Sequence, residues 1–409
     1  MSADFAIIPG ARMQSVKQRV KSWIESSRLP EPARFERKCD YEGLDQADPG
    51  PQKAIELGLA WLCEAQDHSK SCDGGVARHY DLIDGWSASY PETTGYIAET
   101  FLQVGLEPGR QAFVDRGRKM LDWLVSIQFP DGGFQGGVID QLPRVQVTFN
   151  TGQILTGLCE GTRLDSTYRE PMTRAADWLA NSQDEDGCWR KWPTPFAAPG
   201  EKAYETHVAL ALFRAAKLEP GKGYAEAARR QVGWALRHQR PNGWFDKCCL
   251  SRPDAPLTHT LGYALRGLVE AYWFTREAEL LEACLRTADG ILAAIGLDGR
   301  LPGRLDQDWR GVVPWVCLTG SAQIAECLFL LSQMTKTTKY IEKARSANAY
   351  VRRTIKMNGS SAVRGGVKGS FPVDGDYGRW QYLNWACKFM IDANRAELQA
   401  ARDIATAAA

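Results

Sequence analysis

The sequence predicts an all-α protein built as an (α/α)6 toroid, in which six inner helices are surrounded by six outer helices. Two observations predict this fold. Six short segments open apolar helices at spacings of about 54 to 65 residues, and five of them carry threonine at the same place. A second, tryptophan-containing phrase closes four of the amphipathic helices between them. Repetition at such a period is typical of stacked helix pairs.

The predicted inner helices begin at a polar residue followed by an apolar run, as in "YETHVALALF". The six residues are Thr93, Thr151, Thr206, Thr260, Thr319 and Asn384. Threonine and asparagine suit a helix N-terminus because the side-chain oxygen accepts a hydrogen bond from a backbone N–H that the helix leaves unpaired. We therefore expect these side chains to cap the inner helices.

The predicted outer helices carry more charge, as in "MTRAADWLANSQ". Four of them end in the form W-L-x3-Q or W-A-x3-Q followed by Asp-Gly or Asn-Gly, and these phrases begin at Trp61, Trp123, Trp178 and Trp234. Such a dipeptide is a turn, because glycine accepts a positive φ and the Asx side chain bonds its own backbone. The fifth and sixth turns keep only the Asx-Gly pair, at Asp298 and Asn358. Twelve alternating helices of this kind bury their faces as two concentric rings.

The extent of the repeats predicts the domain organisation. We expect a helix around residues 11–27 and an extended lead-in, which together occupy residues 1–50. A single catalytic toroid is expected over residues 51–398, and a fraying tail over residues 399–409. No linker rich in Pro, Gly or Ser divides the chain.

Composition excludes several classes of partner. Fifty Lys plus Arg against 49 Asp plus Glu leave a net charge of +1, so no global field attracts nucleic acid or an anionic membrane. No run approaches the ~20 apolar residues of a membrane span, and no signal peptide is recognised. We therefore expect a cytoplasmic protein whose partner is a small molecule or an oligosaccharide, and the sequence leaves its oligomeric state open.

The repeated phrase carries a family resemblance. W-L-x3-Q-x-x-D-G-x-W/F resembles the QW motif of squalene and hopene cyclases, and "DGGF" is shared with the β subunits of protein prenyltransferases. Over residues 55–395 the chain thus resembles the terpenoid cyclase and protein prenyltransferase superfamily, which implies the toroid. Related toroids also host sugar epimerases, glycoside hydrolases and polysaccharide lyases, so one reaction is not implied. The D-x-D-D motif with which class II cyclases protonate their substrate is missing.

The resemblance also implies where a metal would bind. Prenyltransferase β subunits hold zinc through Asp-x-Cys at one inner helix start and a histidine at the next. The matching positions here are Glu205, His207 and His259. A carboxylate and two imidazoles are adequate zinc ligands with an open fourth position. Because the cysteine of the family is missing, we expect no cofactor and keep zinc at these three residues as the alternative.

Parallel inner helices direct their N-termini to one rim of the central cavity, so we expect the active site there. The candidate acids and bases are Glu92, Tyr90, His79, Glu205 and His259. Arginines at the rim suit a carboxylate or phosphate, and tryptophans suit the C–H faces of sugars or a developing carbocation. The candidate substrate-binding residues are Trp86, Asn150, Gln153, His207, Arg304, Trp309, Gln323, Arg379, Asn384, Trp385 and Lys388.

The leading hypothesis is an enzyme that acts on an acidic or lipid-linked glycan intermediate as an epimerase, a lyase or a glycosidase. Glu92 would be the acid/base, with Tyr90, His79 or His259 as its counterpart. An isoprenoid enzyme, either a prenyltransferase or an atypical cyclase, is the alternative, and a non-catalytic toroid that binds a glycan or protein is the second alternative. The lining of the ring distinguishes them, since an apolar lower cavity favours isoprenoids and a polar one favours sugars.

Overall fold

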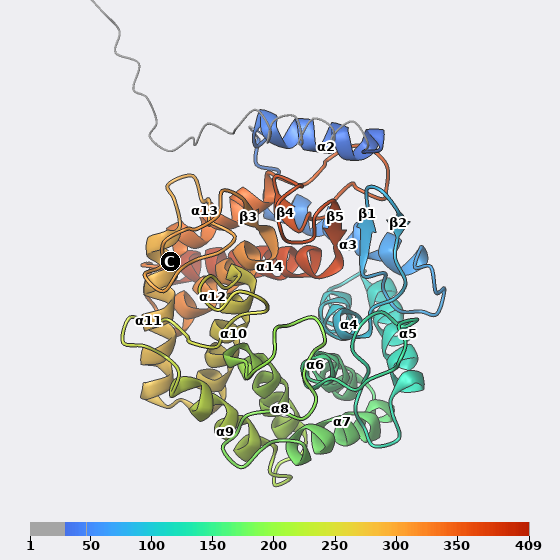
Figure 1. Ribbon diagram of the computed structural model, residues 1–409, viewed down its shortest axis with the longest axis vertical. Coiled ribbons are helices and arrows are strands. Elements are labelled where there is room, and N and C mark those ends of the chain that lie inside the picture. The colour runs from blue at the N-terminus through green and yellow to red at the C-terminus, as the bar shows by residue number, and fades with distance from the viewer. Residues whose placement is uncertain (1–28, 46, 409) are drawn as a thin grey trace, which may run out of the picture.

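The computed structural model describes residues 29–45 and 47–408, and over these the chain forms the expected (α/α)6 toroid (Figure 1). The inner helices are α4 (Pro91–Gly105), α6 (Thr148–Leu164), α8 (Thr206–Leu218), α10 (Thr258–Thr275), α12 (Leu318–Thr335) and α14 (Asn384–Ala408). The outer helices are α3 (Pro51–Asp67), α5 (Gln111–Ile127), α7 (Arg169–Asn181), α9 (Tyr224–Leu236), α11 (Ala278–Ala294) and α13 (Ile341–Arg352). Each inner helix packs against the next, and α14 packs against α4 to close the ring.

The burial of the two sets of helices follows their composition. In α6 every residue from Thr148 to Thr162 is buried, because an inner helix meets neighbours on all sides. In α5 only a stripe that includes Val114, Met120 and Leu124 is buried, and the rest faces solvent. The predicted division into apolar inner and amphipathic outer helices is therefore confirmed.

The repeated glutamine of the tryptophan phrase joins each outer helix to the next. Nε2 of Gln128 donates to the carbonyl oxygen of Gly132 in its own turn (2.9 Å) and to that of Pro171 in α7 (3.0 Å). Gln66 and Gln183 bridge in the same way, and Gln239 reaches its turn through the hydroxyl of Thr287. The sequence identified this glutamine only as part of a motif.

In the first five Asx-Gly turns the glycine also contacts the next outer helix, whereas in the sixth repeat Gly365 makes this contact with α3 in place of Gly359. Gly132 has φ +106° and Gly187 has φ +95°, as the predicted turns require. A Cβ on Gly132 would lie 2.2 Å from the carbonyl oxygen of Arg174, and a Cβ on Gly187 would lie 2.3 Å from that of Arg230. Glycine is therefore needed twice, for the turn and for the close approach.

The predicted threonine caps are wrong. In α4, α6, α8, α10 and α12 the described residues show no side-chain cap at the N-terminus. Oγ1 of Thr151 instead accepts from the N–H of Phe134 (3.0 Å), and Oγ1 of Thr260 donates to the carbonyl of Cys248 (2.7 Å). In the first repeat Thr94 accepts from the N–H of Val76 (3.0 Å). These three hydroxyls fasten the loops that follow α3, α5 and α9 onto the inner helices, whereas Thr206 donates to the carbonyl of Ala264 in α10.

Short strands join the ends of the ring. β1 (His79–Asp81) pairs antiparallel with β2 (Gly85–Trp86) and with β5 (Gln381–Leu383), in the register Tyr80 to Tyr382. Because β5 directly precedes α14, this pairing connects the first repeat to the sixth. A second pair, β3 (Val316–Cys317) and β4 (Ser370–Phe371), lies at the start of α12.

Helices occupy both terminal segments of the described residues. Helix α2 (Glu31–Glu42) forms where an extended lead-in was predicted, and it lies across the outside of the ring (Figure 1). It is held by the buried Lys368, whose ammonium contacts Glu36 (2.7 Å) and Asp40. At the other end, α14 continues through the segment expected as a fraying tail and ends at Ala408. The helix predicted over residues 11–27 lies outside the described residues.

A helix must be long and apolar to cross a bilayer. Within residues 29–45 and 47–408, none of the helices combines the length and the apolar character that crossing a membrane would need.

The Gly132 contact gives a test of how the ring is held. We predict that Gly132→Ala lowers the free energy of unfolding by more than about 4 kcal/mol, because both the turn and the helix contact are disrupted. Gly109→Ala is the matched control, since its φ is +77° and no described atom lies within 4 Å of the new Cβ. It should lose only the ~1–2 kcal/mol of left-handed strain. Urea unfolding measures both, and equal losses would contradict the account.

Candidate active site

A pocket of about 120 Å³ opens at the rim where the inner helices begin. Its lining combines one acid, one imidazole, one guanidinium and a set of aromatic rings. Its lining includes Arg78, Tyr90, Glu92, Tyr96, Phe149, Tyr204, His259, Tyr263, Tyr377 and Trp385. A pocket thus forms at the rim where the sequence predicted the site. Four of the predicted residues line it together: Tyr90, Glu92, His259 and Trp385.

Glu92 is the acid of this pocket. It stands in the first turn of α4, where Pro91 fixes the start of the helix, and part of its side chain faces the pocket. Burial raises the pKa of Glu92 to about 7, against the opposing effects of the Tyr90 hydrogen bond and the Arg78 charge. The Tyr90 hydroxyl donates to Oε2 of Glu92 over 2.7 Å. A carboxyl in this setting is protonated up to about neutral pH.

His259 is the base of this pocket. Its Nδ1 lies 2.7 Å from Oε1 of Gln323, so Nδ1 carries the hydrogen and Nε2 keeps its lone pair. Burial lowers the pKa of His259 to about 4, although the Gln323 hydrogen bond acts in the other direction. The imidazole is therefore neutral at physiological pH. Gln323 orients this ring and is not itself part of the pocket lining given by the described residues.

Aromatic rings and one arginine complete the walls. Nε1 of Trp385 donates to the hydroxyl of Tyr377 (2.8 Å), which fixes both rings. The guanidinium of Arg78 lies 5.0 Å from the centre of the Trp385 ring and 5.7 Å from that of Tyr90. Stacking holds a guanidinium in place and leaves its N–H groups available to a ligand.

Several aromatic residues of the pocket were not singled out from the sequence. Tyr263 follows His259 by four residues, so the two share a helix face, and this spacing could have identified it. Tyr204, Phe149 and Tyr377 gave no such signal. Tyr377 reaches the pocket from a loop, and helix periodicity does not set the course of a loop.

The other predicted acids and bases lie outside this pocket. His79 is on β1, its Nδ1 is 3.0 Å from a guanidinium nitrogen of Arg78, and burial together with Arg78 lowers its pKa to about 3. Glu205 is buried, burial raises its pKa to about 8, and its Oε2 lacks a partner among the described residues.

Five predicted substrate-binding residues have structural contacts instead. Nε1 of Trp309 donates to the carbonyl of Asn242, and a guanidinium nitrogen of Arg304 donates to that of Ala255. The rings of Trp86 and Trp61 lie 5.5 Å apart. Two further residues complete the set: Asn384 donates to the carbonyl of Ala77, and Arg379 is exposed above Trp380.

The remaining four lie deeper in the ring. Asn150 is buried next to Tyr90. Oε1 of Gln153 is 2.7 Å from Nδ1 of His207, which repeats the Gln323–His259 pair. His207 and Lys388 face a second cavity at the other end of the lumen.

The predicted zinc ligands do not come together. His207 and His259 pack against the ring of Tyr263 with centroid distances of 4.6 and 4.4 Å, and Nδ1 of each is bound to a glutamine. In the part of the chain that the structure describes, no group of three His, Cys, Asp or Glu side chains has the arrangement to hold a metal ion. The set of Glu205, His207 and His259 is therefore not a metal site in this geometry.

The pKa of Glu92 predicts how stability depends on pH. A carboxyl whose folded-state pKa lies above its unfolded value of about 4.5 makes the folded state bind more protons, so stability falls as pH rises from about 4.5 to 7. We predict that Glu92→Gln removes the part of this fall that Glu92 causes. Its free energy of unfolding should exceed that of the wild type by on the order of 3 kcal/mol at pH 8, with little difference at pH 5.

Urea titrations between pH 5 and pH 8 measure the effect. Glu226→Gln, at an exposed carboxylate of α9, is the control and should follow the wild type. Glu205→Gln should act in the same direction as Glu92→Gln over the window from about 4.5 to 8. Parallel curves for the wild type and Glu92→Gln would show that Glu92 is not protonated at neutral pH.

Comparison with solved structures shows the same fold in carbohydrate enzymes. An unsaturated glucuronyl hydrolase specific for heparin superposes with a TM-score of 0.69 at 16% identity, over 87% of this chain and 99% of that one. The cellobiose 2-epimerase of Bacillus thermoamylovorans gives 0.65 at 11% identity, over 84% and 98%. A D-mannose isomerase gives 0.66 at 13% identity, over 85% and 97%. At these identities the likeness shows the fold alone.

Sequence comparison gives the family. A copalyl diphosphate synthase of Streptomyces cyslabdanicus is 26% identical over 207 residues, which are 49% of this chain and 33% of that protein. The chain thus matches about a third of the length of this relative. The squalene-hopene cyclase C-terminal domain matches residues 52–269, just over half of the 409 residues. The predicted resemblance is confirmed, and the chain belongs to the squalene-hopene cyclase C-terminal domain family.

Proposed function

We propose that this protein is an enzyme that transfers protons at a sugar carbon, as an epimerase or a lyase, on an acidic or lipid-linked glycan intermediate. One observation carries the proposal. A protonated carboxyl, Glu92, and a neutral imidazole, His259, face the same small pocket with their pKa values displaced in opposite directions. Two titratable groups whose environments separate their pKa values in this way are the mark of an acid and a base.

The ring places these two groups on opposite sides. In the order α4, α6, α8, α10, α12, α14, the helix of His259 is three places from the helix of Glu92 (Figure 1). A substrate between them presents one face to each group. His259 Nε2 would remove a proton from one face while Glu92 supplies a proton to the other, so the total number of protons is conserved. Tyr90 occupies Oε2 of Glu92, which leaves Oε1 for the transferred proton.

The walls suit a sugar. The rings of Trp385 and Tyr377 offer flat surfaces for C–H groups, and Arg78 offers N–H donors to a carboxylate or phosphate. The volume of about 120 Å³ is well below the ~300–1,000 Å³ of pockets that enclose a whole drug-sized ligand, so one ring of a larger substrate would enter. The names of two solved structures with this fold, a glucuronyl hydrolase and a cellobiose epimerase, support a carbohydrate. A cytoplasmic location is part of the same proposal.

Membership of the squalene-hopene cyclase C-terminal domain family favours a second candidate, an isoprenoid enzyme. The lining of the lumen below the pocket argues against it. That cavity contains the charged side chains of Glu99, Arg266 and Lys388, which a hydrocarbon chain would strip of hydration. The sequence analysis named the polarity of the lower cavity as the feature that distinguishes the two classes of substrate. The charged lining of this cavity supports a sugar.

A ligand panel tests the substrate class, because a ligand that binds only the folded state raises the melting temperature. We predict that uronic-acid oligosaccharides, nucleotide sugars or polyprenyl-linked sugars raise it more than inorganic diphosphate does, and that Trp385→Ala abolishes the increase. Farnesyl and geranylgeranyl diphosphate serve as the competing class. Stabilisation by these two alone, growing with chain length, would overturn the proposal in favour of an isoprenoid enzyme.

Hydrogen exchange tests the chemistry without knowledge of the product. With a sugar selected by the panel, wild-type protein in D₂O should replace a carbon-bound hydrogen with deuterium, as observed by proton NMR. We predict that Glu92→Gln and His259→Asn each slow this exchange by about 100-fold or more, since each removes one proton-transfer group. His68→Asn, at an exposed histidine that does not line the pocket, is the control and should retain the wild-type rate. Retention of exchange in Glu92→Gln would exclude Glu92 as the acid.

A further inference from the structure

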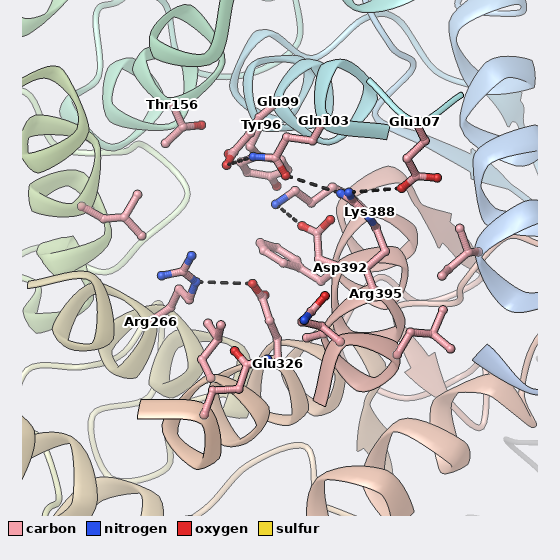
Figure 2. A pocket seen from close by; sticks show the side chains of 18 of the residues that line it. Tyr96, Glu99, Gln103, Glu107, Thr156, Arg266, Glu326, Lys388, Asp392 and Arg395 are labelled. Atoms are coloured by element: carbon pink, nitrogen blue, oxygen red, sulfur yellow. Dashed lines mark hydrogen bonds and ion pairs between the residues drawn. The ribbon is translucent and has the colours of Figure 1, made fainter. Parts of the chain in front are cut away.

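A second cavity, of about 420 Å³, occupies the other end of the lumen, where the inner helices run toward their C-termini (Figure 2). An aromatic layer separates it from the active-site pocket. The ring centroids of Tyr96 and Phe389 are 5.4 Å apart, and those of Tyr263 and Phe389 are 5.9 Å apart. Tyr96 lines both spaces.

Charged side chains from five inner helices surround this cavity. Three carboxylates and three cations form ion pairs with one another: Glu99, Glu326, Asp392, Arg214, Arg266 and Lys388. The lining also contains Glu107, Arg110, Arg395 and Arg402, and Glu107 contacts Arg110 and Arg395. The first six form the pairs Glu99–Arg214, Glu326–Arg266 (3.4 Å) and Asp392–Lys388 (2.5 Å). The last two pairs project into the open space in Figure 2. The side chains of all six are only 8–16% exposed.

Packing does not explain this belt of charges. Buried ion pairs commonly stabilise a protein no more than apolar side chains of similar volume would. One layer above, Tyr96, Tyr263 and Phe389 close the same lumen with rings. The chain therefore has charges and open space where apolar residues would fill the ring, and the volume is within the ~300–1,000 Å³ of ligand sites.

The arrangement of the charges defines the ligand. Each of the three carboxylates has a cation beside it, and Arg214 and Arg266 also contact Glu270 (3.5 and 3.1 Å), so a free anion or a free cation would have to compete with an existing ion pair. Carboxylates only accept hydrogen bonds and Lys or Arg only donate them, whereas a hydroxyl does both. A ligand with several hydroxyls can therefore donate to Asp392 or Glu326 and accept from Lys388 or Arg266. Gln103, towards the mouth, adds an amide of the same mixed character.

We propose that this cavity binds an uncharged polyhydroxylated ligand of mono- or disaccharide size, which enters from the end of the ring opposite to the active-site pocket. The site is separate from Glu92 and His259, so this inference stands whether or not they perform the proposed reaction. It gives the protein a second sugar-binding site at the far end of the lumen.

Calorimetric titration of the full chain tests the proposal, with glucose, mannose, cellobiose and myo-inositol as probes and inorganic phosphate as the charged comparison. Leu330, half-buried on the cavity wall, is the position for a filling substitution that leaves the ion pairs in place. We predict that at least one neutral probe binds at millimolar concentration. Leu330→Trp should weaken that binding at least tenfold, and Leu297→Trp, at a 98% exposed leucine, should not change it.

Two further variants make the result decisive. Lys388→Met combined with Asp392→Leu removes one ion pair without changing the net charge, and should also weaken binding at least tenfold, which covers the case that Leu330→Trp does not fold. Trp385→Ala, in the active-site pocket, should leave binding at this cavity unchanged. The proposal is overturned if none of the neutral probes binds, if only phosphate binds, or if binding is lost in Trp385→Ala and kept in the cavity variants.

Discussion

The contact between a glycine that follows each outer helix and the next outer helix is the constraint on which this structure depends. In the first four repeats a glutamine before the turn also bonds to the turn and to the next helix, as Gln128 does to Gly132 and Pro171. The glycine leaves no room for a side chain at the same place. Repetition of this contact fixes the position of each outer helix relative to its neighbour. The inner helices, held by the loops that follow these turns, consequently start at one rim.

The chemistry of the rim is a result of that geometry. Glu92 and His259 are brought to one pocket from opposite sides of the ring, and burial is the largest cause of both pKa displacements. Burial acts in opposite directions on an acid and on a base because in each case it disfavours the charged form. The aromatic layer under the pocket maintains this environment. Below it the lumen opens into the charged cavity, so the same ring contains one largely aromatic and one ionic compartment.

The fold was predictable because it rests on local and repeated signals. Asx-Gly turns, apolar helix starts and amphipathic spacing all recur along the chain. The structure has an inner helix at each apolar start and an outer helix at each amphipathic segment. The role of the threonines was not predictable, since the loop that Thr151 fastens is defined by the tertiary structure. The same holds for α2, which depends on Lys368 more than 300 residues away in the sequence.

The site was predictable in part, for a related reason. Glu92 and His259 lie in the first turns of inner helices, and the N-termini of parallel helices meet at one rim. Arg304 and Trp309 are in loops, and the direction of their side chains depends on contacts with Ala255 and Asn242 that no periodicity gives. The belt of charges around the lower cavity was missed because its members come from different helices, and helix rotation decides which of them face the lumen.

The claim that most of this account depends on is that Glu92 is held protonated at the rim. Infrared difference spectroscopy observes it directly, since a protonated carboxyl has a carbonyl band that the carboxylate lacks. In wild-type protein this band should disappear with a midpoint near pH 7, and the corresponding signal should be missing from Glu92→Gln. Glu205 adds a band of its own that persists in Glu92→Gln, so the difference between the two proteins is the signal of Glu92. A difference that disappears near pH 4.5, or no difference at all, would contradict the account.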